Sequence, residues 1–387
     1  MVSIYKAVMF TVFGRSSISE FLGDRIVYRN LAPADSSLPS LNDLRGELGL
    51  PTGQTPRKVE PDYARVIVSL LHAARRQDAP GVPIQGLVFI GDTRLLDGTA
   101  FENICQAGGW PGLAFIGSET RQAPSVQVVP TPGGQALYLA NRWATLADFE
   151  RYCAAQGMAI GETTAMVVDL DKTAIGARGR NGQTIDQARL HAVHVTVAGI
   201  LGEAFDTTAF QGAYDLLNTP EFHTFTADNQ DYLAYICLIL GSGLYDLEQV
   251  VNEVRRGKLA SFHQFIDGVE RRAGELPAAL REVHQGIYTN VQAGDPTPFK
   301  PFRRNEYLET VSRMGCLGDD IPAEQLLNEE IVITQEVRRM ALAWRQRGAL
   351  LFGLSDKPDE ASLPTPELAA RGYQPIHRTE THVVGTK

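Results

Sequence analysis

Short runs of uninterrupted apolar residues recur along the chain and alternate with segments in which apolar residues return every three or four positions. Four of the runs are GLVFIGD (86–92), LAFIG (113–117), AMVVDLD (165–171) and ALLFGLSDKP (349–358), and each ends in or leads into a polar or glycine-containing turn. Runs of this length are typical of strands buried on both faces of a parallel sheet. We therefore expect these runs to be core strands.

The segments between the runs predict helices. Pro61 suits the first turn of one helix, whose apolar stripe is formed by Tyr63, Val66, Ile67, Leu70, Leu71 and Ala74. Further helices are expected at about 97–107, closed by Gly108, and at 146–156.

Two more elements complete this pattern. VQVV and ALYLA, on either side of Pro132, are typical of a hairpin. A helix beginning at Asn328 is expected to have an apolar face of Ile333, Val337, Met340 and Trp344. The alternation of helices with buried strands predicts an α/β fold with a doubly wound, Rossmann-like, mostly parallel sheet.

The remaining segments indicate how the chain is divided. KAVMFTVF (6–13) is typical of a strand, and Pro, Gly, Ser and Asp interrupt any regular period after it, up to residue 57. From 176 to 327, apolar residues recur at helical spacing, as in DYLAYICLIL and LEQVVNEVRR. We therefore expect a helical domain at 176–327, inserted into an α/β core formed by 1–175 and 328–387.

Composition narrows the functional classes. The chain of 387 residues has a formal net charge of −9, which argues against broad nucleic-acid binding because phosphate backbones are held mainly by clustered Lys and Arg. No apolar stretch approaches the roughly 20 residues of a membrane helix, and no cleavage site follows the apolar N-terminal run. We therefore expect a cytoplasmic protein without a membrane partner. The four cysteines are widely spaced, so neither a disulfide framework nor a zinc knuckle is expected.

Polar residues with catalytic potential follow three of the expected strands. Asp92 and Asp97 come after the first run, Asp169 and Asp171 lie at the end of the third, and Ser355 follows the fourth. The carboxyl ends of parallel strands lie along one edge of a sheet, where ligands bind. An Asp at a strand end is also typical of a turn or a helix cap, so the prediction of a site depends on the convergence of these residues.

Together these motifs resemble those of the haloacid dehalogenase superfamily, in particular its phosphoglycolate-phosphatase-like members. DLDKT (169–173) resembles the first motif, Ser355 in LLFGLSDKP the second, Lys58 before its helix the third, and GDTRLLD (91–97) the acidic fourth. Their order along this chain is third, fourth, first, second, which is a cyclic rotation of the family order. The resemblance therefore implies a circularly permuted core, with the helical insertion as a substrate-selecting cap.

A cyclic rotation changes the order of the motifs along the chain but keeps their order in space. We therefore expect the strand that ends at Asp169 to lie between the strands that end at Asp92 and Ser355.

The resemblance implies a phosphohydrolase that acts on a small phosphorylated metabolite. Asp169 is the expected nucleophile, which forms an aspartyl-phosphate, and Asp171 is expected to protonate the leaving alcohol and later to activate water. Lys58 would neutralise Asp169 and the phosphoryl group, and Ser355 would hold a phosphoryl oxygen. Thr173, within the first motif, is a candidate for substrate binding.

The resemblance also implies a metal ion. Several carboxylates at one sheet edge repel one another unless a cation and a lysine compensate their charge. The octahedral oxygen shell of Mg²⁺ suits carboxylates and water. The expected metal-binding residues are Asp169, Asp92 and Asp171, the last through its backbone carbonyl, with Asp97 as a supporting acid of the same site.

Two segments beyond the motifs are further candidates. KTAIGARGRNGQT (172–184) is rich in Gly and small polar residues, which would permit the opening of a flap, as the resemblance implies. In the insertion, Arg303 and Arg304 are candidates for binding an anionic part of the substrate, with ordinary surface arginines as the alternative. His191 and His194 share a helical face but lack a third ligand nearby, so we expect no metal there.

Three alternatives remain open. A phosphotransferase or phosphomutase would use the same residues but would pass the phosphoryl group to a sugar hydroxyl. A non-catalytic interaction protein could retain the fold, although it would have no need for a costly carboxylate cluster. In an unrelated α/β binding protein the Asp residues would cap helices, and Lys58, Asp92, Asp169 and Ser355 need not converge.

Overall fold

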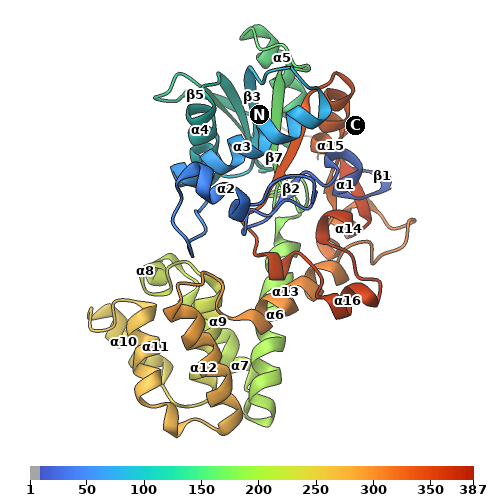
Figure 1. Ribbon diagram of the computed structural model, residues 1–387. Helices are drawn as coiled ribbons and strands as arrows, with labels where there is room; N and C mark the ends of the chain where they lie inside the picture. Colours follow the sequence, from blue (N-terminus) through green and yellow to red (C-terminus); the bar gives the residue numbers. More distant parts are fainter. Residues whose placement is uncertain (1–8) are drawn as a thin grey trace. The chain divides into compact units, whose positions relative to one another are not determined.

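The computed structural model describes residues 9–387 (Figure 1). The chain divides into two compact units. The first comprises the chain up to Gln187 together with Thr310–Lys387, and the second comprises Ala188–Glu309. Among the described residues, no helix has the length and apolar character needed to cross a membrane.

The first unit is built on a seven-stranded sheet with the strand order β2-β9-β7-β3-β4-β6-β5. All neighbouring strands pair in parallel except β5, which runs antiparallel to β6. The strands are β2 (Ile26–Val27), β3 (Gly86–Gly91), β4 (Gly112–Gly117), β5 (Val126–Pro130), β6 (Ala136–Ala140), β7 (Thr164–Asp169) and β9 (Leu350–Leu354). The mostly parallel α/β sheet and the hairpin of β5 and β6 are thus confirmed.

Helices cover both faces of this sheet, because successive side chains of a strand point to opposite faces. They are α1 (Ile18–Leu22), α2 (Leu41–Leu48), α3 (Pro61–Asp78), α4 (Leu96–Gly108), α5 (Leu146–Ala155) and α15 (Gln335–Gln346). On one face, Leu87 and Phe89 of β3 share a core with α2, α3 and α4. On the other face, Phe115 of β4 contacts Phe149 of α5, and α15 packs against α5, α1 and β9.

The connections of the sheet reverse direction between β3 and β7. After β3 the chain adds β4, β5 and β6 on one side, and then it crosses back to place β7 and β9 on the other. At such a switch point a crevice opens at the carboxyl ends of the two central strands. Asp92 directly follows β3, and Asp169 is the last residue of β7. The strand that ends at Asp169 lies between those that lead to Asp92 and Ser355, as predicted.

The region before the last core strand differs from the prediction. It contains α14 (Ala323–Glu329), β8 (Ile333–Thr334) and α15. The expectation of one helix starting at Asn328 was wrong, because Asn328 lies inside α14 and α15 begins only at Gln335. Ile333 pairs with Val383 in a strand. It lies four residues before Val337 and therefore imitates a helical repeat in the sequence.

A second, three-stranded sheet joins the two ends of the chain. Its order is β1-β10-β8, with β1 at Thr11–Ser16 and β10 at Thr381–Gly385. The strand predicted at 6–13 overlaps β1, and residues 6–8 lie outside the described residues. The short helix α16 (Pro366–Ala370) precedes β10.

The second unit consists of helices and connecting turns. Its helices are α6 (Gly182–Leu201), α7 (Thr207–Leu217), α8 (His223–Thr226), α9 (Gln230–Gly241), α10 (Leu247–Arg255), α11 (Phe262–Arg271), α12 (Ala278–Gln292) and α13 (Lys300–Ser312), of which the first and last also reach into the first unit. The unit is shorter at both ends than the predicted insertion, 176–327. The reason is that Asn181 donates hydrogen bonds to the carbonyls of Leu327 and Glu330 within the first unit.

Candidate active site

A buried lysine joins two carboxylates at the switch point. Lys58 lies in the turn that leads into α3, and its Nζ donates to Asp169 Oδ1 and to Asp97 Oδ1, both at 2.6 Å. All three side chains are buried. Burial alone would lower the pKa of Lys58, but the adjacent Asp169 and Asp97 carboxylates raise it well above its usual value. Lys58 is therefore a fixed positive charge between the end of β7 and the first turn of α4.

Asp97 shapes the turn after β3. Its Oδ2 accepts hydrogen bonds from the backbone N–H of Asp92 at 2.9 Å and of Thr93 at 2.8 Å. Gly91 makes this close approach possible, because a Cβ at that position would lie 2.6 Å from Asp97. Both oxygens of Asp97 are thus engaged by protein groups, one by Lys58 and one by the turn. Asp97 is therefore suited to support the site rather than to bind a ligand directly.

Three carboxylates meet beside Lys58. Ligand oxygens of Asp92, Asp97 and Asp169 all lie within 4.8 Å of one another. Burial raises the pKa of Asp169 well above its usual value, and the charges of Asp97 and Asp92 push it the same way while Lys58 opposes them. Burial and the neighbouring Asp97 raise the pKa of Asp92 to about 7, against the effect of Arg178. Further positive charge would stabilise the ionised carboxylates.

The donor atoms of this cluster fit a hard divalent cation. Lys58 binds only Oδ1 of Asp169, and Arg178 binds only Oδ2 of Asp92. Within residues 9–387, no hydrogen-bond donor engages the second oxygen of either carboxylate, and carboxylate oxygens are the ligands that Mg²⁺ prefers. Asp92 and Asp169 fit the predicted metal site, whereas Asp97 fits the supporting position.

Asp171 and Ser355 form a second group on the neighbouring strand ends. Ser355 Oγ donates to Asp171 Oδ2 at 2.7 Å, and the backbone N–H of Lys357 donates to Ser355 Oγ at 3.0 Å. The carboxylate of Asp171 is therefore not one of the three clustered carboxylates. The predicted residues thus converge at the carboxyl ends of neighbouring strands, since Asp92 follows β3, Ser355 follows β9, and Lys58 contacts Asp169 at the end of β7. Independent helix caps would not require this convergence.

Two cations of the site were missed in the sequence. Arg178 Nε donates to Asp92, and Lys357 Nζ lies 4.0 Å from Asp171 Oδ1. Lys357 follows Ser355 by two positions, and this spacing could have suggested it. Arg178 lies in a Gly-rich segment whose composition suggested a flap, so no signal marked it as part of the site.

The segment predicted to be a flap is tied down by buried contacts. Arg180 donates to Glu336 at 2.9 Å, and Asn181 Oδ1 accepts from the backbone N–H of Val332 at 3.1 Å. Gly179 has φ +75°, and a Cβ there would lie 2.0 Å from the carbonyl oxygen of Glu119. Thr173 is fully buried, and its carbonyl accepts a hydrogen bond from Thr334. The glycines serve close packing here, and opening of the segment as a flap stays a prediction.

The predicted residues of the helical unit have other partners. Arg303 is buried and donates to Asp231 at 2.8 Å and to Glu306 at 2.6 Å, so it is committed to internal ion pairs and its proposed contact with substrate has no support. Arg304 is exposed. His191 pairs with a glutamate, and the one group of metal-ligating side chains found among the described residues is the Asp92 cluster.

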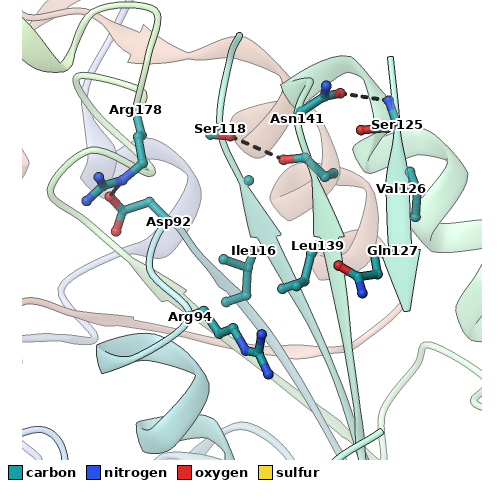
Figure 2. A pocket seen from close by; sticks show the side chains of 12 residues that line it. Asp92, Arg94, Ile116, Ser118, Ser125, Val126, Gln127, Leu139, Asn141 and Arg178 are labelled. Atoms are coloured by element: carbon teal, nitrogen blue, oxygen red, sulfur yellow. Dashed lines mark hydrogen bonds and ion pairs between the residues drawn. The ribbon is translucent and has the colours of Figure 1, made fainter. Parts of the chain in front are cut away.

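A pocket of about 400 Å³ opens beside Asp92 at the carboxyl ends of β3, β4 and β6. Figure 2 shows Arg178 next to Asp92, with Ile116 and Leu139 side by side on adjacent strands. The acidic cluster and the pocket therefore share Asp92.

No family model, curated protein or solved structure matches this chain.

Proposed function

We propose that this protein is a Mg²⁺-dependent phosphohydrolase of the haloacid dehalogenase type, in which Asp169 forms an aspartyl-phosphate. The contact of Lys58 with Asp169 at the switch point carries the proposal. It joins Lys58, which resembles the third motif, to Asp169, which resembles the first motif and lies 111 positions later in the chain. A circular permutation of the family's motif order accounts for this arrangement, and the helical unit (188–309) would be the cap.

The chemistry assigned to Asp169 gives its two oxygens different roles. Oδ1, beside Lys58, attacks phosphorus, and the bond from phosphorus to the ester oxygen breaks, while Oδ2 stays available for the metal ion. Asp171 gives its proton to the leaving alcohol. Water then attacks the phosphorus of the aspartyl-phosphate, and Asp171 takes a proton from this water. The bond from phosphorus to the Asp169 oxygen breaks, which releases phosphate and restores the Asp169 carboxylate.

The surrounding residues compensate charge and hold geometry. Lys58 neutralises Asp169 and the phosphoryl oxygens as negative charge moves onto them. Ser355 orients Asp171 through its hydrogen bond and can turn its hydroxyl toward a phosphoryl oxygen. Lys357, which is buried beside Asp171, adds positive charge on the same side.

A bound Mg²⁺ would lower the repulsion between an incoming phosphate and the carboxylates. Asp92, Asp169 and the backbone carbonyl of Asp171 would hold it. Asp97 would keep Lys58 and the turn bearing Asp92 in position through the hydrogen bonds of both its oxygens.

Release of inorganic phosphate from a panel of phosphomonoesters, with Mg²⁺ and with a chelator, tests the proposal. The wild type should release phosphate only with Mg²⁺, and D169N should release none. D320N is the matched control, because Asp320 is exposed and lies outside the site. Transfer of the phosphoryl group to an added alcohol without phosphate release would favour a phosphotransferase. No reaction with any ester, together with no Mg²⁺ binding, would favour a non-catalytic protein.

A further inference from the structure

The pocket beside Asp92 has an apolar floor and a polar rim. Ile116 of β4 and Leu139 of β6 form the floor, and Arg94, Gln127 and Arg178 contribute polar groups around it (Figure 2). Its volume of about 400 Å³ is within the usual range for small-molecule sites and is larger than a phosphate group requires.

The two arginines keep hydrogen-bonding capacity for a ligand. Arg94 is exposed in the turn between β3 and α4, and within residues 9–387 no ion pair or hydrogen bond engages it. Arg178 donates a hydrogen bond from Nε to Asp92, and its two Nη atoms donate to no described residue. The lining thus contains two guanidinium groups and one carboxylate, Asp92, so the pocket has a surplus of positive charge on an otherwise acidic protein.

We propose that this pocket binds a second oxyanion of the substrate, a carboxylate or another phosphate, while the reacting phosphoryl group lies at Asp169. This inference rests on the proposed function. The forked geometry of guanidinium groups suits carboxylate and phosphate oxygens. The carbon skeleton between the two anionic groups packs on Ile116 and Leu139. The substrate class is thus a small phosphomonoester with a second negative group a few atoms from the ester oxygen.

Arg94 provides the test, because it lies in the pocket and outside the catalytic group. Phosphoserine and phosphoethanolamine differ by one carboxylate, and ethylene glycol bisphosphate and its monophosphate differ by one phosphate. For the wild type, we expect a lower KM for the doubly anionic member of at least one pair. R94A should raise that KM about tenfold or more, as expected for the loss of a charged hydrogen bond, and should leave kcat and the KM of the matched partner nearly unchanged. R76A is the control, because Arg76 is exposed at the C-terminal end of α3, away from the pocket.

The outcomes separate this inference from the proposed function. Hydrolysis of all four esters with equal KM values, unaffected by R94A, overturns the pocket inference and leaves the phosphohydrolase standing. If no ester is hydrolysed, calorimetric titration with the same four compounds decides. Binding of a doubly anionic compound that R94A weakens about tenfold supports the pocket without the reaction. Equal or absent binding of all four overturns the inference as well. A larger effect for the carboxylate pair or for the bisphosphate pair identifies the second group.

Discussion

Lys58 Nζ lies 2.6 Å from Asp169 Oδ1, although the two residues are 111 positions apart in the chain. The contact joins the turn before α3 to the end of the central strand β7. Because Lys58 also binds Asp97 at 2.6 Å, one ammonium group partly compensates the charge of two buried carboxylates.

Replacing Lys58 with Met should destabilise the protein. The substitution leaves Asp97 and Asp169 buried without their cation, and breaking a buried ion pair from one side typically costs about 3–5 kcal/mol. Urea denaturation followed by tryptophan fluorescence measures the change. R76M is the control, because Arg76 is an exposed cation of the same unit and its loss should leave the midpoint unchanged. An unchanged midpoint for K58M would contradict the contact.

Binding of Mg²⁺ should stabilise the protein in the absence of substrate. A cation held by Asp92 and Asp169 relieves the repulsion between them, and a ligand at a hundred times its Kd adds about 2.7 kcal/mol of stability. The melting temperature of the wild type should therefore rise with Mg²⁺, whereas that of D92N should change little. D320N should respond as the wild type does. An equal shift in all three proteins would place the ion elsewhere.

The proposed division of labour between Asp169 and Asp171 can be tested with a radiolabelled phosphomonoester. D169N should form no acid-stable phosphoenzyme and should retain its fold, because Asn is nearly isosteric with Asp. D171N should still form some phosphoenzyme but should hydrolyse it about 10²–10⁴ times more slowly, which is the usual contribution of a general base. Labelled D169N protein, or equal turnover in D171N and the wild type, would refute these roles.

Gly179→Ala should lower the stability and displace Arg178. The residue has φ +75°, and a Cβ would lie 2.0 Å from the carbonyl oxygen of Glu119, so both conformational strain and a backbone clash arise. Gly134→Ala isolates the first effect, because Gly134 has φ +82° and nothing within 4 Å of its Cβ position. G134A should cost about 1 kcal/mol, and G179A should cost clearly more in the same denaturation assay. Equal losses would show that the loop can move away from Glu119.

The core strands could be predicted because an uninterrupted apolar run bounded by turns has few other stable placements. The convergence of Asp92, Asp169 and Ser355 followed from the geometry of parallel strands alone. Arg178 could not be predicted, because its position depends on the packing of Gly179 against Glu119, a contact between residues far apart in the chain. Arg303 was misjudged for a similar reason. Nothing in KPFRRNEY indicates that the carboxylate of Asp231, on another helix, is buried beside it.

Replacing Arg303 with Met should unfold the helical unit at a lower temperature without changing the α/β unit. Arg303 is the buried cation that pairs with Asp231 and Glu306, so its loss leaves the buried Asp231 carboxylate without its cation and Glu306 with one ion pair fewer, since Arg189 still contacts it. The chain permits separate measurements, because its tryptophans, Trp110, Trp143 and Trp344, all lie in the first unit. Far-ultraviolet circular dichroism should therefore show an early loss of helix that tryptophan fluorescence does not.

R304M is the matched control, because Arg304 is the exposed neighbour and its loss should leave both signals as in the wild type. An altered substrate preference in R303M with unchanged melting would instead restore Arg303 as a substrate contact, and simultaneous melting by both probes would show that the two units unfold together.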